Sequence, residues 1–501
     1  MKGHDAVALA RQSPPEARPL VDVLKWPVLG SFLRWRHSRV VLSGLTLIFS
    51  VALVFHAFWG PTLAPKNLAT LVTWVHFRGL VVLIIVLAGN LFCMACPFML
   101  PRELVRKWWS PRLVFPAWLR TKWIGIALFV AVLFAYELFD LFAEPFWTGV
   151  LIVAYFSAAL AVDSLFQRAS FCKYLCPVGQ FNFVCSMFSP LEVRARDVEK
   201  CAGCQTKDCI VGRRAEAGAG TPESAGALPI VQRGCELGLY QPRKRGNVDC
   251  TFCLDCVYAC PHDNVGLTSR LPGEAAIADG TRSGIGALER RWDMTALFVV
   301  FTFGAILNAF AMISPVYALE QWIAERSGLR VEWPILLLLF VLSLVLLPII
   351  LLGACGMVGL RADQHSKSLG AHVRYFARSL VPLGFGIWLA HYGFHFFTGF
   401  LTVIPVTQNA VEELAGRPWL GAAQWQLGGL PESMVYPIEL GFLLLGLVTA
   451  VWISWELAAR VAPKRVTACF APWCLLHLTL CAVAVWIMNQ PMDMRGTFLG
   501  G

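Results

Sequence analysis

The chain alternates between long apolar runs and short polar segments along most of its 501 residues. Several runs approach the roughly 20 residues that a helix needs to span a bilayer. We therefore predict a polytopic α-helical membrane protein with about nine spans. Their expected bounds are 40–59, 71–92, 123–139, 146–166, 294–314, 333–353, 379–403, 434–456 and 468–489.

One polar stretch is too long to be a simple loop between two spans. Residues 168–293 carry most of the clustered cysteines and separate a first membrane block, 40–167, from a second, 294–489. A leader, 1–39, precedes the first block, and a short tail, 490–501, follows the second. No small-residue cleavage site follows the first apolar run, so we interpret that run as an anchor rather than a signal peptide. We expect the tail to be external.

Charge is scarce and unevenly distributed. Only 15% of the residues are charged, against about 25% in soluble proteins. The net charge of +10 does not indicate nucleic-acid binding, because the Lys and Arg residues gather in alternate connecting segments. The opposite segments hold only Lys66, Arg326, Arg330, Arg417 and Arg495. This bias predicts a bacterial inner (cytoplasmic) membrane protein with its N-terminus and its 168–293 domain in the cytoplasm and its C-terminus outside.

The most specific motif is Cys250-Thr-Phe-Cys253-Leu-Asp-Cys256-Val-Tyr-Ala-Cys260-Pro261. In bacterial ferredoxins this C-x2-C-x2-C-x3-C-P spacing binds one [4Fe–4S] cluster through three cysteines and a neighbouring cluster through the fourth. A zinc site with four thiolates is the alternative, because C-x2-C pairs also suit zinc. The C-x3-C-P ending favours iron–sulfur, and cytoplasmic cysteines stay reduced and free to bind metal.

A less regular set of cysteines precedes this motif. Cys204 and Cys209 are separated by four residues rather than two, and Cys235 is followed by Glu236 rather than proline. In two-cluster ferredoxins the remote cysteine of each half binds the other cluster. By that logic one [4Fe–4S] cluster takes Cys201, Cys204, Cys209 and Cys260, and the other takes Cys235, Cys250, Cys253 and Cys256. We therefore predict a ferredoxin-like domain with two clusters.

Two further cysteine pairs lie where predicted spans leave the membrane. Cys93 and Cys96 follow the second span, and Cys172 and Cys176 follow the fourth. A proline ends the helix after each pair, which brings the two cysteines of a pair close together. Four thiols at one depth could bind a metal, form redox disulfides or border a quinol site. Apolar packing at two helix ends is the alternative.

Three histidines lie inside predicted spans: His391, His395 and His477. Ionisable residues within a bilayer are rare and usually functional. Neutral imidazole can bind haem iron or copper, or hydrogen-bond a quinol. A haem would need ligands from two helices, such as His391 and His477, and hydrogen bonding between helices without a cofactor is the alternative. Arg78, in the second span, is expected to extend to the outer interface.

A family resemblance rests on the Cys172-Lys-Tyr-Leu-Cys176-Pro sequence followed by the eight cysteines of the polar domain. Over residues 71–265 the chain resembles the membrane-bound polyferredoxin family. That family includes the quinol-linked iron–sulfur subunit of periplasmic nitrate reduction, the C-terminal part of the nitrous oxide reductase regulator and an accessory protein of cytochrome oxidase assembly. Its membrane-edge motifs are usually both C-x3-C-P, whereas Cys93 and Cys96 form C-x2-C-P.

Together these features predict a membrane-bound iron–sulfur electron-transfer protein with two [4Fe–4S] clusters. It would pass electrons between a cytoplasmic or quinone donor and a membrane or external redox partner, with haem b or quinone as a further cofactor. We expect a subunit of a respiratory or redox complex rather than a complete enzyme. One alternative is a redox-driven assembly or metal-reducing factor for a respiratory metalloenzyme. A second is a redox-sensing transporter or regulator.

Overall fold

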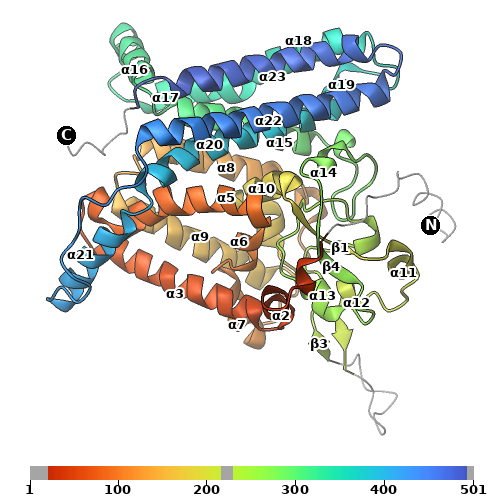
Figure 1. Ribbon diagram of the computed structural model, residues 1–501, viewed down its shortest axis with the longest axis horizontal. Coiled ribbons are helices and arrows are strands. Elements are labelled where there is room, and N and C mark those ends of the chain that lie inside the picture. Colours follow the sequence, from red (N-terminus) through yellow and green to blue (C-terminus); the bar gives the residue numbers. More distant parts are fainter. Residues whose placement is uncertain (1–20, 216–228, 493–501) are drawn as a thin grey trace.

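Long helices that run side by side dominate the computed structural model, which describes residues 21–215 and 229–492 (Figure 1). Within these residues, eight helical stretches are long and apolar enough to cross a bilayer, which is the pattern of a polytopic membrane protein. They are Ser38–Trp59 (α3), Leu68–Ala88, Pro145–Leu165 (α9), Trp292–Phe310 (α15), Trp333–Leu360, Leu369–Gly399, Glu432–Val461 (α22) and Val466–Met488 (α23).

Three of these stretches change helix type along their length. A π-helical or 3₁₀ segment interrupts each one, and such interruptions in α-helices often mark functional positions. Leu68–Ala88 contains α4 (Leu68–Thr70), a π-helix at Leu71–Phe77 and α5 (Arg78–Ala88). Trp333–Leu360 contains α17 (Trp333–Val341), a π-helix at Leu342–Leu346 and α18 (Leu347–Leu360). Leu369–Gly399 contains α19 (Leu369–Phe376), a 3₁₀-helix at Ala377–Leu380 and α20 (Val381–Gly399).

One of the nine predicted spans, 123–139, forms a shorter helix than the others. Residues Trp123–Leu138 form α8, an apolar helix of 16 residues. At 1.5 Å per residue it extends about 24 Å, less than the roughly 30 Å of a bilayer's hydrocarbon core. The crossing at 123–139, and with it an odd number of spans, therefore stays a prediction.

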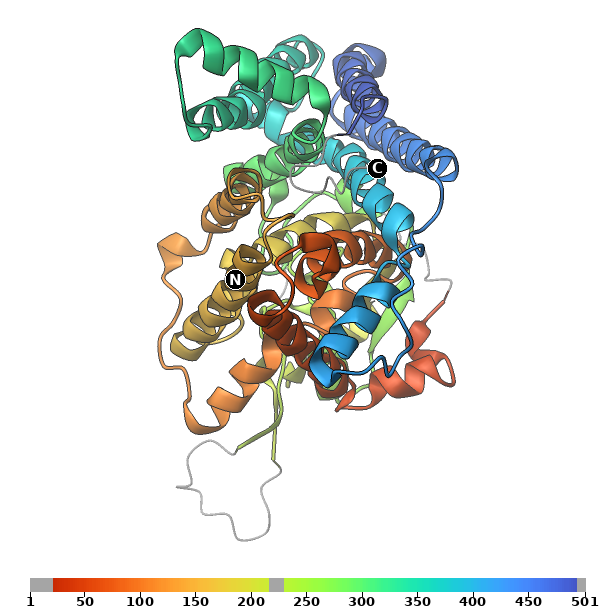
Figure 2. The same ribbon diagram turned by 90° about the vertical axis from the view of Figure 1, so that its left-hand side faces the viewer.

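The helices form two blocks that pack along α20. Figure 2, which looks along the bundle from the α21 end, places α22 and α23 on one side of the N-terminal helices. Helix α20 is almost completely buried, and its Trp388 donates a hydrogen bond from Nε1 to the carbonyl oxygen of Phe301 in α15 at 3.0 Å. Against α22 the backbones approach so closely that a Cβ on Gly386 would lie 2.7 Å from the carbonyl oxygen of Phe442. The first and second membrane blocks thus share one core.

Shorter helices occupy the two ends of the bundle. Helices α16 and α21 lie at the end opposite the polar domain (Figure 1). The α-helices outside the spans and the polar domain's cysteine segments are α2 (Leu29–Arg34), α6 (Leu91–Met94), α7 (Met99–Trp108), α10 (Pro177–Cys185), α14 (Glu274–Ile277), α16 (Ser314–Ser327) and α21 (Val403–Ala415). A further π-helix covers Phe171–Leu175, and 3₁₀-helices cover Val23–Lys25, Ala64–Lys66, Ala117–Leu119, Ser186–Phe188, Gln241–Arg243 and Leu288–Arg290.

The polar domain is closed by a two-stranded sheet. Strand β1 (Leu191–Ala195) pairs antiparallel with β4 (Val265–Ser269), with Val193 opposite Leu267. This pairing brings together the two ends of the segment that carries the eight predicted cluster cysteines. The segment's short elements are α11 (Val198–Ala202), α12 (Asp208–Val211), β2 (Arg213–Arg214), β3 (Ile230–Gln232) and α13 (Asp255–Ala259). Most of the predicted leader and tail, 1–20 and 493–501, lies outside the described residues.

Candidate iron–sulfur sites

Four cysteines from both halves of the domain border one cavity. We call them site one: Cys201, Cys204, Cys209 and Cys260. Burial raises the pKa of Cys201 to about 11, with the thiols of Cys260 and Cys204 adding to the effect. All four side chains line this one cavity, so they lie near enough to share a cofactor. The structure thus places Cys260 with the first-half cysteines, the set that ferredoxin logic predicts.

The other four cysteines also gather, around a tightly wound loop. We call Cys235, Cys250, Cys253 and Cys256 site two. Burial raises the pKa of Cys256, and the thiols of Cys235, Cys253 and Cys250 raise it further. Asp249, Phe252 and Leu254 all have φ between 54° and 62°. Non-glycine residues rarely adopt this left-handed conformation, and where they do it is concentrated at functional sites.

The loop turns backbone N–H groups toward the sulfur atoms of site two. The N–H of Leu239 donates to Cys235 Sγ at 3.5 Å, and the backbone N–H groups of Phe252 and Asp255 act to lower the pKa of Cys250 and Cys253 against the larger effect of burial. Hydrogen bonds to the sulfur atoms are one of the means by which proteins tune iron–sulfur clusters. The donor set of both sites therefore suits an iron–sulfur cluster, while the ligation itself stays a prediction.

Sites one and two are neighbours. The N–H of Cys235, a member of site two, donates a hydrogen bond to the carbonyl oxygen of Cys209, a member of site one, at 2.7 Å. The thiol of Cys235 also raises the pKa of Cys209, after the larger effects of burial and of the other thiols of site one. Groups bound at the two sites would therefore lie close enough for electron exchange.

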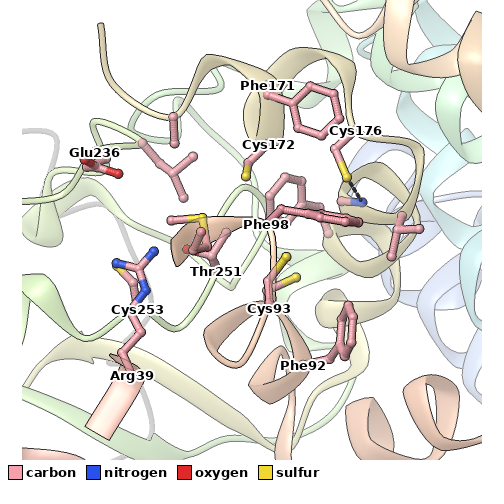
Figure 3. A pocket seen from close by; sticks show the side chains of 17 residues that line it. Arg39, Phe92, Cys93, Phe98, Phe171, Cys172, Cys176, Glu236, Thr251 and Cys253 are labelled. Carbon is pink, nitrogen blue, oxygen red and sulfur yellow. Dashed lines mark hydrogen bonds between the residues drawn. The ribbon is translucent and has the colours of Figure 1, made fainter. Parts of the chain in front are cut away.

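A third gathering of cysteines lies between the domain and the membrane helices. Cys93, Cys96, Cys172 and Cys176 all border one pocket, which we call the four-thiol pocket. Figure 3 shows Cys172 and Cys176 on one side of the pocket and Cys93 on the other. Cys253 of site two borders the same pocket. The two pairs that the sequence places at separate helix ends thus meet at one location.

The thiols of this pocket are held by hydrogen bonds. Asn182 donates from Nδ2 to Cys93 Sγ at 3.3 Å, and the N–H of Gly179 donates to Cys176 Sγ at 3.1 Å. Cys176 is the N-cap of α10, whose N-terminal N–H groups favour a thiolate, but burial outweighs them and raises the pKa of Cys176. Burial raises the pKa of Cys93 to about 12, so metal binding there would release protons.

Within residues 21–215 and 229–492, no three or more His, Cys, Asp or Glu side chains lie close enough to hold a single metal ion. This finding applies equally to site one, site two and the four-thiol pocket. Around a [4Fe–4S] cluster each cysteine binds a different iron, so its sulfur atoms stand farther apart than around one ion. Both the iron–sulfur ligation and the zinc alternative therefore stay predictions.

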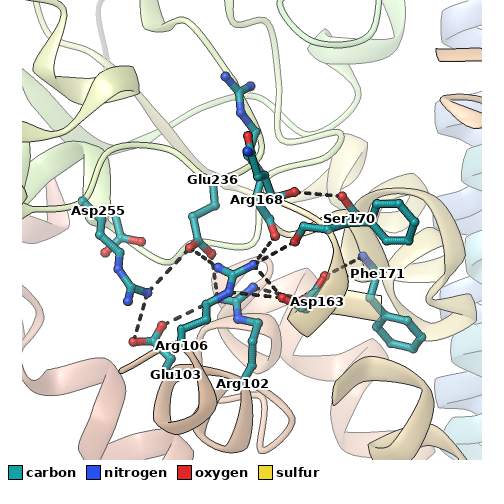
Figure 4. Close-up of polar contacts among 12 residues, drawn as sticks. Arg102, Glu103, Arg106, Asp163, Arg168, Ser170, Phe171, Glu236 and Asp255 are labelled. Atoms are coloured by element: carbon teal, nitrogen blue, oxygen red, sulfur yellow. Dashed lines mark hydrogen bonds and ion pairs between the residues drawn. The ribbon is translucent and has the colours of Figure 1, made fainter. Parts of the chain in front are cut away.

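An ion-pair network fixes the domain on the membrane block (Figure 4). Glu236, which directly follows Cys235, binds Arg102 at 2.6 Å and Arg106 at 2.8 Å, both from α7. Arg102 also contacts Asp163 at the end of α9, at 3.2 Å. Burial alone would raise the pKa of Glu236, but the two arginines outweigh it and hold the value at about 2. The sequence alone did not predict this network. Its one signal was Glu236, which stands where ferredoxins usually have a proline after the remote cysteine.

The structure brings only two of the three membrane histidines together. His391 and His395 lie in α20 with their ring centroids 5.0 Å apart. Both ring nitrogens of His391 are buried and have no hydrogen-bond partner among the described residues. Beside them Arg78 lies over the ring of Tyr392 and donates to Tyr136 Oη at 3.2 Å. Arg78 is only 8% exposed, so the expectation that it extends to the outer interface is wrong.

His477 lies in a different part of the core. Its Nε2 is within hydrogen-bond distance of Ser454 Oγ at 2.9 Å and of Ser379 Oγ at 3.2 Å. Ser379 precedes His391 by twelve residues on one composite helix, which corresponds to about 18 Å. The structure therefore does not bring His391 and His477 together as two ligands of one haem.

Comparison with known proteins gives two partial similarities. Over 104 residues the chain is 33% identical to "Putative electron transport protein YccM" of Escherichia coli (strain K12), covering 20% of this chain and 22% of that protein. Over 199 residues it is 27% identical to "Methylamine utilization ferredoxin-type protein MauN" of Methylobacillus flagellatus, covering 37% of this chain and 68% of that protein. No family model and no solved structure matches. These similarities support a distant relationship to ferredoxin-type electron transport proteins and a general role in electron transfer.

Proposed function

We propose that this chain is a membrane-bound electron-transfer protein that holds one [4Fe–4S] cluster at site one and another at site two. The observation that carries the proposal is the crossed grouping of cysteines. Cys260 ends the second motif, yet it borders the cavity of Cys201, Cys204 and Cys209. Cys235, from the first half, interacts with the second-half cysteines. Two-cluster ferredoxins exchange their remote ligands in this way.

The contacts of the two sites support an order along the electron path, with site two nearer to the membrane helices. Cys253 of site two borders the four-thiol pocket at the helix ends, whereas no cysteine of site one borders it. Asn90, just beyond α5, donates from Nδ2 to the carbonyl oxygen of Cys250 at 2.7 Å. A soluble partner would therefore exchange electrons at site one, and a membrane partner, such as a quinone or another redox protein, would exchange them beyond site two.

The proposed location is a bacterial cytoplasmic membrane with the domain on the cytoplasmic side. The connecting segments rich in Lys and Arg, at α7 and between α22 and α23, lie at the same end of the bundle as the domain (Figure 1). Helices α16 and α21 lie at the other end. Positive charge accumulates on cytoplasmic segments, so this distribution supports the orientation expected from the sequence.

The crossed ligation can be tested by measuring iron in pairs of variants. Cys260→Ala and Cys201→Ala should each remove about four iron atoms per chain, and the double variant should lose no more, because both residues bind one cluster. Combining Cys260→Ala with Cys256→Ala should remove about eight. Cys481→Ala, at a buried cysteine of α23, is the control and should keep all the iron. Equal losses in the two double variants would contradict the crossed arrangement, and stoichiometric zinc would contradict the function.

A further inference from the structure

The four-thiol pocket has the properties of the two predicted cluster sites. Four cysteines from two distant segments border one cavity, as at site one. The sulfur atoms of Cys93 and Cys176 accept N–H hydrogen bonds at 3.3 and 3.1 Å. At site two, Cys235 Sγ accepts a comparable bond from the N–H of Leu239 at 3.5 Å. The pocket therefore presents four cysteine side chains, two of which accept hydrogen bonds of the kind seen at site two.

The four thiols lie close to one another in the pocket. As at sites one and two, no three of the described side chains are close enough to hold one metal ion. Yet each thiol acts electrostatically on the others: Cys172, Cys96 and Cys93 all contribute to the raised pKa of Cys176, after burial. Four cysteines that border one pocket are the ligand set that an iron–sulfur cluster uses, in which each binds a different iron.

Polar contacts fix the walls of the pocket. Arg39 of α3 borders it and pairs with Asp255, beside Cys253, at 3.2 Å. The N–H of Phe171, the residue before Cys172, donates to Asp163 at 2.9 Å, and Asp163 is held by Arg102. The elements that carry the cysteines are therefore fixed relative to one another, which suits a permanent ligand set rather than mobile helix ends.

We propose that Cys93, Cys96, Cys172 and Cys176 hold a third iron–sulfur cluster, located between site two and the membrane helices. This proposal rests on the proposed function, because the third centre extends the same electron path. One electron would pass from the cluster at site two to the centre in the pocket. The donor cluster is thereby oxidised and the acceptor reduced, and no proton is transferred and no bond forms or breaks. The electron would then be available to an acceptor in the membrane.

Iron content separates this proposal from the proposed function. Anaerobically purified protein should contain about twelve iron atoms per chain, and Cys93→Ala/Cys176→Ala should contain about eight while keeping the EPR signals of two [4Fe–4S] clusters. Cys185→Ala is the matched control, because Cys185 is completely buried in the same helix, α10, but does not border the pocket. It should keep about twelve.

A second variant tests the proposal independently, because Cys93→Ala/Cys176→Ala could lose iron simply by misfolding. Replacing Cys201, Cys204, Cys250 and Cys256, none of which borders the pocket, by alanine should leave about four iron atoms per chain, bound in the pocket. If the wild type and Cys93→Ala/Cys176→Ala both contain about eight iron atoms per chain, the third cluster is overturned and the proposed function stays intact. Stoichiometric zinc lost only in that double variant, or a disulfide between the pairs found by mass spectrometry of the intact protein, would also overturn it. Absence of iron from the wild type would overturn both proposals.

Discussion

At the residue scale, Glu236 explains a departure from the ferredoxin pattern. A proline usually follows the remote cysteine, but here the next residue is a glutamate that binds Arg102 and Arg106 of α7. The residue after Cys235 is therefore tied to the membrane block by ion pairs that a proline could not make. A sequence pattern can identify the substitution but cannot reveal its partners, because α7 lies more than a hundred residues earlier in the chain.

Loss of this contact should destabilise the protein. Glu236→Ala leaves the buried Arg102 without its shortest ion pair, and we expect a loss of about 3 kcal/mol of unfolding free energy. Glu103→Ala is the control, because Glu103 is more exposed and lies 3.6 Å from Arg102 and 3.9 Å from Arg39. Denaturant unfolding in detergent should show a much smaller effect for the control. Equal losses in the two variants would contradict the role of Glu236.

A buried carboxylate within the domain should make stability depend on pH. Burial acts to raise the pKa of Glu192, but Arg270 at 2.6 Å and Lys244 at 3.6 Å outweigh it and lower the pKa below 4.5. The ionised form is therefore favoured by folding, so its stabilisation is present above pH 4.5 and is lost as the pH falls through the lowered value.

The test is Glu192→Gln, which removes the charge and keeps the shape. We expect a loss of about 3 kcal/mol at pH 7, because two buried cations lose their counter-ion. The difference from the wild type, followed by thermal unfolding in detergent, should shrink as the pH is lowered below 4.5. A difference that stays constant with pH would show that the carboxylate is not ionised in the folded protein.

At the scale of elements, the end of α5 is where the domain meets the membrane block. Gly89 ends the helix with φ 73°, and a Cβ there would lie 2.4 Å from Ser189 Oγ and 2.8 Å from the ring of Phe252. Phe252 lies between Cys250 and Cys253 in the loop of site two. The chain reversal before Cys93 thus needs glycine both for its conformation and for the close approach.

Gly89→Ala should therefore destabilise the junction. The left-handed conformation alone costs an L-residue roughly 1–2 kcal/mol, and displacement of Phe252 should lower the iron retained at site two. Gly44→Ala is the control, since a Cβ at Gly44 in α3 would meet Leu100 at an ordinary 3.7 Å. Thermal unfolding and iron content should both fall for Gly89→Ala and not for the control. If Gly89→Ala changes neither the thermal unfolding nor the iron content, the end of α5 does not pack tightly against the domain.

At the scale of the whole molecule, local sequence patterns predict the individual helices and motifs better than they predict the contacts between them. The apolar runs predict most of the membrane helices, because a span is set by about 20 consecutive residues. The C-x2-C-x2-C-x3-C-P spacing predicts the cysteine sets, because the cluster constrains the local chain. The burial of Arg78 among aromatic rings and the separation of His477 from His391 depend on packing between helices. No short stretch of the sequence reveals that packing.

The orientation of the whole chain is open to a direct test. Fusions of green fluorescent protein and of alkaline phosphatase after residue 364, between α18 and α19, and after residue 424, between α21 and α22, report opposite sides of the membrane. We expect fluorescence at the first position and phosphatase activity at the second, because Lys and Arg gather at the first end. The reverse pattern would place the domain outside the cytoplasm.

The account depends most directly on two [4Fe–4S] clusters in the domain. The decisive measurement is EPR of the anaerobically purified full chain after reduction with dithionite, with the spins quantified per chain. We expect signals of reduced [4Fe–4S] clusters amounting to at least two spins, broadened by the contact between sites one and two. A protein with stoichiometric zinc and no such signals would contradict it.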